Sequence, residues 1–261
     1  MDNQNNRYVA YFDILGFKTA TFRDAEKACQ MLLELRHWMD DVLKRRINRR
    51  SKNSDSFQEE IIIADRIKIY IFSDSVLMFT KTDKEEDFLS ILLMAHHLFA
   101  NSICSGLPLR GGISFGEFFF DTDLHLFCGI PLVKAVELEK MSQWCGIVLD
   151  DIVAHNYQAF CNKYGGASIL VDDDTPFITK WDVPITSSGK KNCWVINWPV
   201  LLKPRETPPL PLPMSVYDYY KHLEEIFGPY DELREKDQLK YKNTVDFLNA
   251  QRMSRKGNCS I

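Results

Sequence analysis

The spacing of apolar residues predicts the first elements of the chain. Residues 8–13 have the composition of a buried strand, but the strand ends on a carboxylate, Asp13. Residues 24–46 then place apolar side chains on one face at helical spacing, which predicts a helix. The arginine-rich segment 44–60 that follows is expected to be a solvated connector rather than a phosphate-binding patch.

The next apolar runs continue this pattern. Residues 61–81 hold two β-rich runs that meet at Ser73-Asp74-Ser75, which predicts a hairpin with Asp74 at or beside its turn. A second amphipathic helix is predicted over 86–103 and a further strand over 109–120. The resulting order, β-α-β-β-α-β, predicts an α+β protein with a ferredoxin-like sheet and both of these helices on one face.

That topology bears directly on the two carboxylates, Asp13 and Asp74. The first strand would lie beside the hairpin, so both acids would come close together at one end of the sheet. Two nearby carboxylates repel each other unless one is protonated or a cation lies between them, and such a pair suits magnesium or manganese. Gly16, Lys18 and Thr19 then offer a tight turn, a cation and a hydroxyl to a phosphate group. The simpler alternative is that Asp13 caps the next helix and Asp74 only makes a turn.

The second half of the chain is less regular. A helix is predicted over 131–144, and another over 151–164, between short strands at 146–150 and 167–171. These would add strands to the ferredoxin-like core.

A change of composition marks the C-terminal part. Residues 203–213 contain five prolines and read as an extended connector, and 214–253 show helical patterns with charge on most faces. We therefore expect a main domain over 7–200, a connector over 201–213 and a helical C-terminal extension over 214–261, packed on the domain or on a partner subunit.

Composition and charge exclude several classes of protein. The net charge of -4 is unusual for a general nucleic-acid binder. No apolar run reaches the roughly 18 residues needed to span a bilayer, and the first residues do not resemble a signal peptide. The seven cysteines form no CxxC pair, which suits a reducing cytoplasm and argues against structural zinc. His96 and His97 are adjacent on a predicted helix, so they point in different directions and are expected at the edge of the core.

Four motifs together resemble the class III adenylate and guanylate cyclases. "FDILGF" (residues 12–17) is similar to the first-acid signature of that family, and "IFSDSVLMF" (71–79) is similar to its second-acid hairpin. "LPLRGGISFGE" (107–117) resembles the next strand of the family, and "FCGIPLVKAVELEK" (127–140) resembles the helix after it. The resemblance extends over residues 8–149, and the whole pattern is most similar to the pyrimidine cyclases of the bacterial Pycsar antiphage systems.

This resemblance implies roles for particular residues. Asp13 and Asp74 correspond to the two metal-binding, catalytic aspartates, and the backbone carbonyl of Ile14 corresponds to an accessory metal ligand. The turn at Gly16, Phe17 and Lys18 corresponds to the triphosphate-binding loop. The resemblance therefore implies two Mn²⁺ or Mg²⁺ ions in each site, held mainly by the two aspartates.

The departures from the family pattern concern the base and the transition state. Tyr70 stands where purine cyclases use Lys or Glu to recognise the base, and a phenol narrows the pocket in a way that suits a pyrimidine. Val133 and Glu137 stand where the family has its transition-state Asn and Arg. Arg110 and Lys134 are the nearby cations that could substitute as substrate-binding residues.

The resemblance implies a homodimeric uridylate cyclase that forms cyclic UMP and pyrophosphate from UTP and signals to a separate antiphage effector. A cytidylate cyclase that acts on CTP is one alternative. A homologue that binds a nucleotide without turnover is another, favoured by the missing Asn and Arg. An RNA-binding sheet is a third, but Gly112 and Gly116 lie where stacking aromatic residues would be needed.

Overall fold

A computed structural model of the chain describes residues 6–44, 46–50, 57–104, 106–164, 176–186, 189–201 and 213–258. The strands are β1 (Asn6–Ile14), β2 (Arg46–Arg50), β3 (Phe57–Ile62), β4 (Ile67–Phe72), β5 (Ser75–Thr80), β6 (Leu109–Asp121), β7 (Leu126–Gly129), β8 (Ile147–Leu149), β9 (Ile178–Ile185) and β10 (Gly189–Ile196). The helices are α1 (Phe17–Arg23), α2 (Ala25–Leu43), α3 (Glu85–Cys104), α4 (Ile130–Met141), α5 (Asp151–Tyr164), α6 (Val216–Tyr220), α7 (Glu224–Phe227) and α8 (Glu235–Asn258), with 3-10 turns η1 (Ile63–Asp65), η3 (Trp198–Leu201) and η4 (Tyr230–Glu232).

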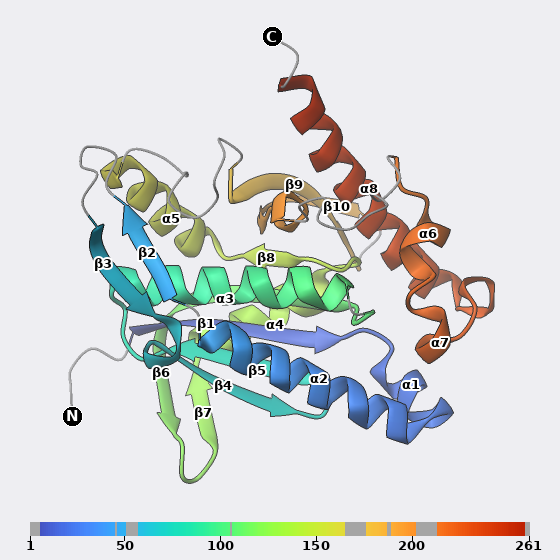
Figure 1. Cartoon of the computed structure of the whole chain (residues 1–261), viewed down its shortest axis with the longest axis horizontal. Coiled ribbons are helices and arrows are strands. Elements are labelled where there is room, and N and C mark those ends of the chain that lie inside the picture. The colour runs from blue at the N-terminus through green and yellow to red at the C-terminus, as the bar shows by residue number, and fades with distance from the viewer. Residues whose placement is uncertain are drawn as a thin grey trace.

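The central sheet confirms the predicted topology. Its strand order is β4-β5-β1-β6-β8-β10-β9, with β7 paired to β6 outside this path (Figure 1). The first four strands of that order are antiparallel to one another and carry the ferredoxin-like β-α-β-β-α-β succession. A parallel pairing of β8 with β6 and the β9–β10 hairpin extend the sheet beyond that core. The protein is therefore an α+β fold with a mostly antiparallel sheet.

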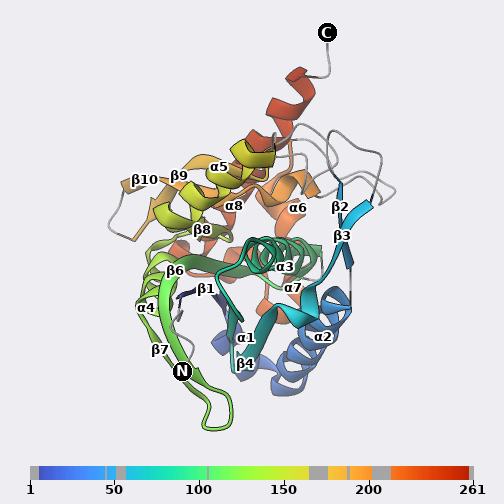
Figure 2. The same ribbon diagram turned by 90° about the vertical axis from the view of Figure 1, so that its left-hand side faces the viewer.

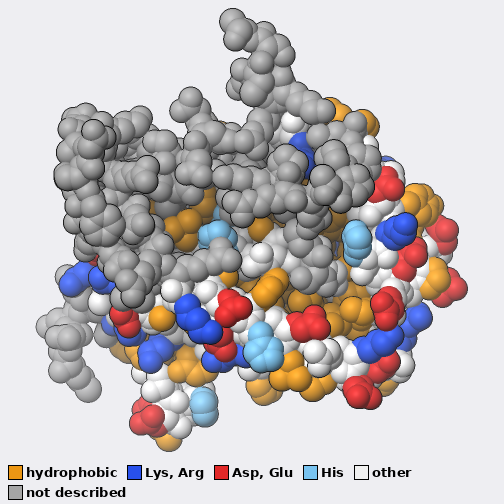
Figure 3. Space-filling model, viewed as in Figure 1, with side chains coloured by type: hydrophobic (Ala, Val, Ile, Leu, Met, Phe, Trp, Pro, Cys, Tyr) orange, Lys and Arg blue, Asp and Glu red, His pale blue; other side chains and the backbone are white. Residues whose placement is uncertain are grey.

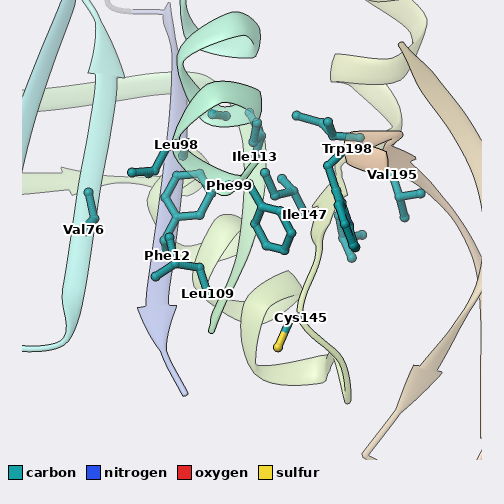
Figure 4. Close-up of a cluster of buried hydrophobic side chains, with 14 of the residues drawn as sticks. Phe12, Val76, Leu98, Phe99, Leu109, Ile113, Cys145, Ile147, Val195 and Trp198 are labelled. Atoms are coloured by element: carbon teal, nitrogen blue, oxygen red, sulfur yellow. The ribbon is translucent and has the colours of Figure 1, made fainter. Parts of the chain in front are cut away.

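The two faces of the sheet differ in chemistry, and β1 shows the difference most clearly. Because side chains alternate along a strand, Tyr8, Ala10 and Phe12 point to one face, and all three are buried in the main apolar core. That core lies between the sheet and the helices α2 and α3. Figure 4 shows Phe12 of β1 against Leu98 and Phe99 of α3. We call this side the core face.

The opposite side, which we call the second face, carries Tyr11 and Asp13 of β1 and is partly covered by α4. The helix approaches β6 very closely, because a Cβ placed on Gly112 would lie only 2.4 Å from the backbone oxygen of Ala135. A larger residue at 112 would therefore push α4 away from the sheet. In Figure 2, α4 and α2 lie on opposite sides of the molecule.

Several elements differ from the sequence prediction. The arginine-rich segment 44–60, predicted as a connector, contains β2 and the first part of β3, and these two strands pair as a separate antiparallel ribbon. The prediction was wrong there because a ladder forms through backbone hydrogen bonds, which polar residues supply as well as apolar ones. The short helix α1 and the strands β7, β9 and β10 were also not predicted individually. The strand predicted at 167–171 lies outside the described residues.

The C-terminal helices pack on the rest of the chain rather than standing apart from it. Tyr220, Leu223 and Phe227, together with Tyr241 and Phe247, belong to the same apolar core as the β1 residues. Contacts of α7 with α1 place this segment near the end of β1, and Figure 1 shows the two helices side by side. The division into units at 7–200, 201–213 and 214–261 stays a prediction.

The described residues on one face of the molecule are mixed in charge. On the face drawn in Figure 3, Lys and Arg side chains are interspersed with Asp and Glu side chains and do not gather into one basic patch. None of the described helices is both long enough and apolar enough to cross a membrane.

Candidate active site

The end of β1 and the β4–β5 turn meet at one end of the sheet. The backbone N–H of Ile14 donates a hydrogen bond of 2.9 Å to the backbone oxygen of Asp74. Asp13 lies opposite Ser75 of β5 on one side and opposite Arg110 of β6 on the other. The two aspartates, 61 positions apart in the sequence, are therefore neighbours in the fold, as predicted.

A pocket of about 380 Å³ opens at this end of the sheet. It is lined by the β1–α1 segment, by residues from the neighbouring strands and by the C-terminal helices. Of the predicted site residues, the pocket brings together Asp13, Ile14, Gly16, Phe17, Lys18, Asp74 and Arg110. Tyr70 and Lys134 are not among its lining residues.

Arg110 lies between two acids. Its guanidinium is 3.4 Å from Oδ2 of Asp13 and 2.5 Å from Oε1 of Glu139, and it also donates a hydrogen bond of 3.2 Å to the backbone oxygen of Ser142. One cation thus partly neutralises two half-buried or buried carboxylates. Arg110 is therefore the cation that compensates the carboxylate at the end of the apolar strand β1.

The environment of the acids favours their protonated forms. Burial raises the pKa of Asp13, Arg110 opposes that rise, and the charge of Asp74 adds to it. Burial also raises the pKa of Glu139 to about 7, despite the ion pair with Arg110. A further cation between Asp13 and Asp74 would relieve the repulsion that raises the pKa of Asp13.

The simpler alternative for Asp13, a helix cap, is wrong. The N-cap of α1 is Gly16, which makes no side-chain capping bond, and the N-cap of α2 is Asp24, whose side chain accepts a hydrogen bond from the N–H of Lys27. The carboxylate of Asp74 forms no hydrogen bond or ion pair with any residue that the structure describes. Neither acid therefore has a capping role to explain its presence in the pocket.

The turn after β1 depends on Gly16. Its φ of 79° is in the left-handed region that glycine adopts without strain. A Cβ at this position would lie 3.1 Å from the ring of Phe227 in α7. Phe17, Lys18 and Thr19 follow this turn and line the same pocket as the two carboxylates.

Tyr70 lies farther along the second face, in an aromatic cluster. Its ring is stacked on Phe79, with centroids 5.9 Å apart, and contacts Phe127 of β7 with centroids 4.7 Å apart. Val9 and Phe118 complete the buried part of this cluster. Within one chain, the residue predicted to recognise the base is therefore not in the carboxylate pocket.

The other predicted cation, Lys134, is engaged elsewhere. Its ammonium lies 3.1 Å from Oδ2 of Asp150, which also accepts a hydrogen bond of 2.7 Å from Ser114. Val133, at the position of the family's Asn, is 57% exposed on α4.

Sequence reasoning missed four charged residues near the two aspartates. Glu139 is paired with Arg110, and the C-terminal residues Arg234, Asp237 and Lys240 line the pocket. The helical pattern of 214–253 predicts an extension packed on the domain or on a partner subunit, but its charge on most faces does not single out these three residues. The only sequence signal was the local alternation of opposite charges at 234–240, which is common on exposed helices.

The donor set fits one class of metal. Two carboxylates and a backbone carbonyl at an open pocket suit Mg²⁺ or Mn²⁺, which use few protein ligands and complete their shells with phosphate and water. In the described part of the chain, no group of three or more His, Cys, Asp or Glu side chains is arranged to hold a metal ion by itself. The site would therefore hold an ion together with its substrate.

No protein-family model and no curated protein sequence matches the chain. Among solved structures, it is similar to the adenylyl cyclase CyaB from P. aeruginosa, with 16% identity and a TM-score of 0.46, over 73% of this chain and 93% of that chain. It is also similar to a bacterial light-regulated adenylyl cyclase, with 11% identity and a TM-score of 0.45, over 74% of this chain and 90% of that chain. At such values the likeness carries no argument about substrate, metal or assembly.

Proposed function

We propose that the protein is a metal-dependent nucleotidyl cyclase that converts UTP into 3′,5′-cyclic UMP and pyrophosphate. The observation that carries the proposal is the meeting of Asp13 and Asp74 in one pocket with the glycine turn at Gly16. The four motifs that resemble class III cyclases provide three elements of this pocket, at 12–17, 71–79 and 107–117.

In this proposal, each pocket residue has a defined task. Asp13 and Asp74, with the carbonyl of Ile14, would hold two Mn²⁺ or Mg²⁺ ions. When bound, such ions acidify the ribose 3′-hydroxyl and neutralise charge on the α-phosphate and on the leaving pyrophosphate. The Gly16–Lys18 turn would bind the triphosphate through backbone N–H groups and the Lys18 ammonium. Alignment and charge stabilisation supply most of what phosphoryl transfer requires of a protein.

The position of Tyr70 favours a site shared between two subunits. Because Tyr70 is separated from the carboxylate pocket within one chain, a single copy does not present both ends of a nucleotide site. Exposed apolar side chains near the aromatic cluster, on the β6–β7 hairpin and the start of α4, are suitable material for a contact with a second copy. They are Phe119, Leu124, Leu126, Ile130 and Val133.

A mixed dimer tests this shared site. A subunit with Asp13→Asn and a subunit with Tyr70→Ala are each expected to be inactive as homodimers. Mixed together, they would regenerate one intact site per heterodimer, with Asp13 from one copy and Tyr70 from the other. Turnover by the mixture confirms sharing, whereas a mixture as inactive as its parents, or a fully active monomer, contradicts it.

The biological role follows from the product. A cytoplasmic enzyme of this kind would make a second messenger for a separate antiphage effector, as the Pycsar resemblance implies. Uracil and cytosine differ mainly in one exocyclic group, so CTP with cyclic CMP as product is the closest alternative substrate.

A second candidate function is nucleotide binding without turnover. One observation favours it: the two cations available to replace the missing transition-state Arg, Arg110 and Lys134, are both engaged in ion pairs. The retention of both acids, Asp13 and Asp74, in one pocket favours the cyclase instead.

The direct experiment is incubation of the full-length protein with each of the four nucleoside triphosphates and Mn²⁺. We expect a cyclic monophosphate from UTP, no product from the Asp13→Asn variant, and full activity from Asp41→Asn, a matched change on the exposed side of α2. Turnover of ATP or GTP alone would overturn the pyrimidine assignment. Binding of UTP without any product would favour the second candidate.

A further inference from the structure

The C-terminal segment forms one wall of the carboxylate pocket. Phe227 of α7 lies against the turn at Gly16, and a Cβ on Gly228 would collide with the guanidinium of Arg23 in α1. An ion pair of 2.9 Å also joins Lys27 of α2 to Glu225. These contacts hold the segment over the end of β1, beside α1 (Figure 1).

The helix α8 is fixed independently at its middle. Thr244 Oγ1 accepts a hydrogen bond of 2.7 Å from the backbone N–H of Cys145, and the amide of Asn243 donates one of 2.7 Å to the backbone oxygen of Gln143. The rings of Phe247 and Trp144 meet with centroids 4.8 Å apart. Lys240 precedes Thr244 by four residues, so it lies one turn along the same face and is held at the pocket.

The charges of this wall are arranged around one acid. Asp237 accepts contacts from Lys240 at 3.0 Å and from Arg234 at 2.7 Å. The Lys240 side chain is only 15% exposed, and Lys240 lines the same pocket as Asp13 and Asp74. Two cations and one anion of the C-terminal segment thus line the pocket that also holds the two acids.

We propose that Lys240, assisted by Arg234, binds the terminal phosphates of a metal-bound polyphosphate, so that the C-terminal extension is part of the substrate site. A polyphosphate carries several negative charges and would compete with Asp237 for both cations. The nucleotide part of this assignment rests on the proposed function, but binding of a polyphosphate alone does not.

The test uses inorganic tripolyphosphate and Mn²⁺ with the full-length protein, measured by titration calorimetry. Lys240→Gln is expected to weaken tripolyphosphate binding by at least about tenfold, Lys240→Arg to retain it, and Arg234→Gln to weaken it less because that side chain is more exposed. Lys242→Gln, an exposed change on the same helix away from the pocket, is the matched control and leaves the affinity unchanged.

The variant Asp237→Asn distinguishes a phosphate-binding role of this charged cluster from a role in anchoring α8 alone. If Asp237 competes with the phosphates, its neutralisation strengthens tripolyphosphate binding; if the cluster only anchors α8, it weakens binding, as Lys240→Gln would. Equal affinities for Lys240→Gln and Lys242→Gln, weaker binding by Asp237→Asn, or no tripolyphosphate binding by the wild type would each overturn the inference.

Failure of the inference is distinguishable from failure of the proposed function. Cyclic nucleotide formation with an unchanged KM in Lys240→Gln would contradict this phosphate site and leave the cyclase intact. Absence of any cyclic product, with tripolyphosphate binding lost in Lys240→Gln, would contradict the cyclase and leave the phosphate site.

Discussion

The two faces of the same sheet differ in how they accommodate polar groups. On the core face, β1 contributes Tyr8, Ala10 and Phe12, all buried, and the nearby His96 of α3 is fully buried with neither ring nitrogen hydrogen-bonded to a described residue. On the second face, the carboxyl group of Asp13 lies beside the guanidinium of Arg110, with a second acid close by. One strand therefore supplies apolar core on one side and, in the proposed function, a metal-binding carboxylate on the other.

This difference predicts where stability and activity separate. Burial of apolar area stabilises the fold, whereas a group held near a like charge does not. Changes on the core face should lower the free energy of unfolding, and changes at the pocket should affect metal binding and turnover while leaving that free energy nearly unchanged.

The largest expected effect on stability is that of Phe12→Ala. Phe12 is fully buried against α3, so its truncation should cost about 3–5 kcal/mol of unfolding free energy. Chemical denaturation measures the change. Tyr11→Phe, the neighbouring position on the second face, should cost about 1 kcal/mol, since it removes only the 2.6 Å hydrogen bond with Ser75. Equal losses at the two positions would contradict the contrast between the faces.

At the pocket, Asp74→Asn is expected to have the opposite effect to Phe12→Ala: a large loss of turnover and no loss of stability. Turnover should fall by at least about a hundredfold, because a carboxylate ligand of the metal ions that would neutralise the reacting phosphate is lost. The melting temperature in metal-free buffer should not fall, since the wild-type carboxylate has no partner among the described residues. A marked drop in that temperature would show that Asp74 is structural.

The buried His96 predicts how the stability of the core face depends on pH. Burial lowers the pKa of His96 well below its usual value, with a smaller contribution from His97. The unfolded chain then binds a proton below about pH 6.5 that the folded chain does not, so stability should fall as the pH falls, by up to about 1.4 kcal/mol per pH unit. The measurement is the difference in unfolding free energy between the wild type and His96→Leu from pH 7.5 to 5.5; a constant difference would contradict it.

The smallest expected effect concerns the far end of the second face. Tyr70→Phe keeps the ring stacked on Phe79 and removes a hydroxyl that has no hydrogen-bond partner among the described residues. Stability should change by less than about 0.5 kcal/mol, while the ratio of UTP to CTP turnover should change several-fold, since one hydrogen bond contributes about 1 kcal/mol. An unchanged ratio would remove Tyr70 from base recognition.

The sequence was most informative where periodicity and turn chemistry act together. The run before Asp13 and the two runs around Asp74 define neighbouring strands, and the β-α-β-β-α-β order then places the two acids together. Residues whose role depends on distant packing could not be found in this way. Glu139 and Lys240 reach the site only because α4 packs on Gly112 and α8 packs on the 142–146 segment, which no local pattern encodes.

The central claim is that the second face holds divalent metal between Asp13 and Asp74, and Mn²⁺ binding tests it most directly. Electron paramagnetic resonance can count the Mn²⁺ ions bound per chain in the presence of a non-hydrolysable UTP analogue. The account predicts two ions for the wild type and for Asp41→Asn, and loss of both at the same concentrations in the double variant Asp13→Asn with Asp74→Asn. Undiminished Mn²⁺ binding by the double variant would contradict the account.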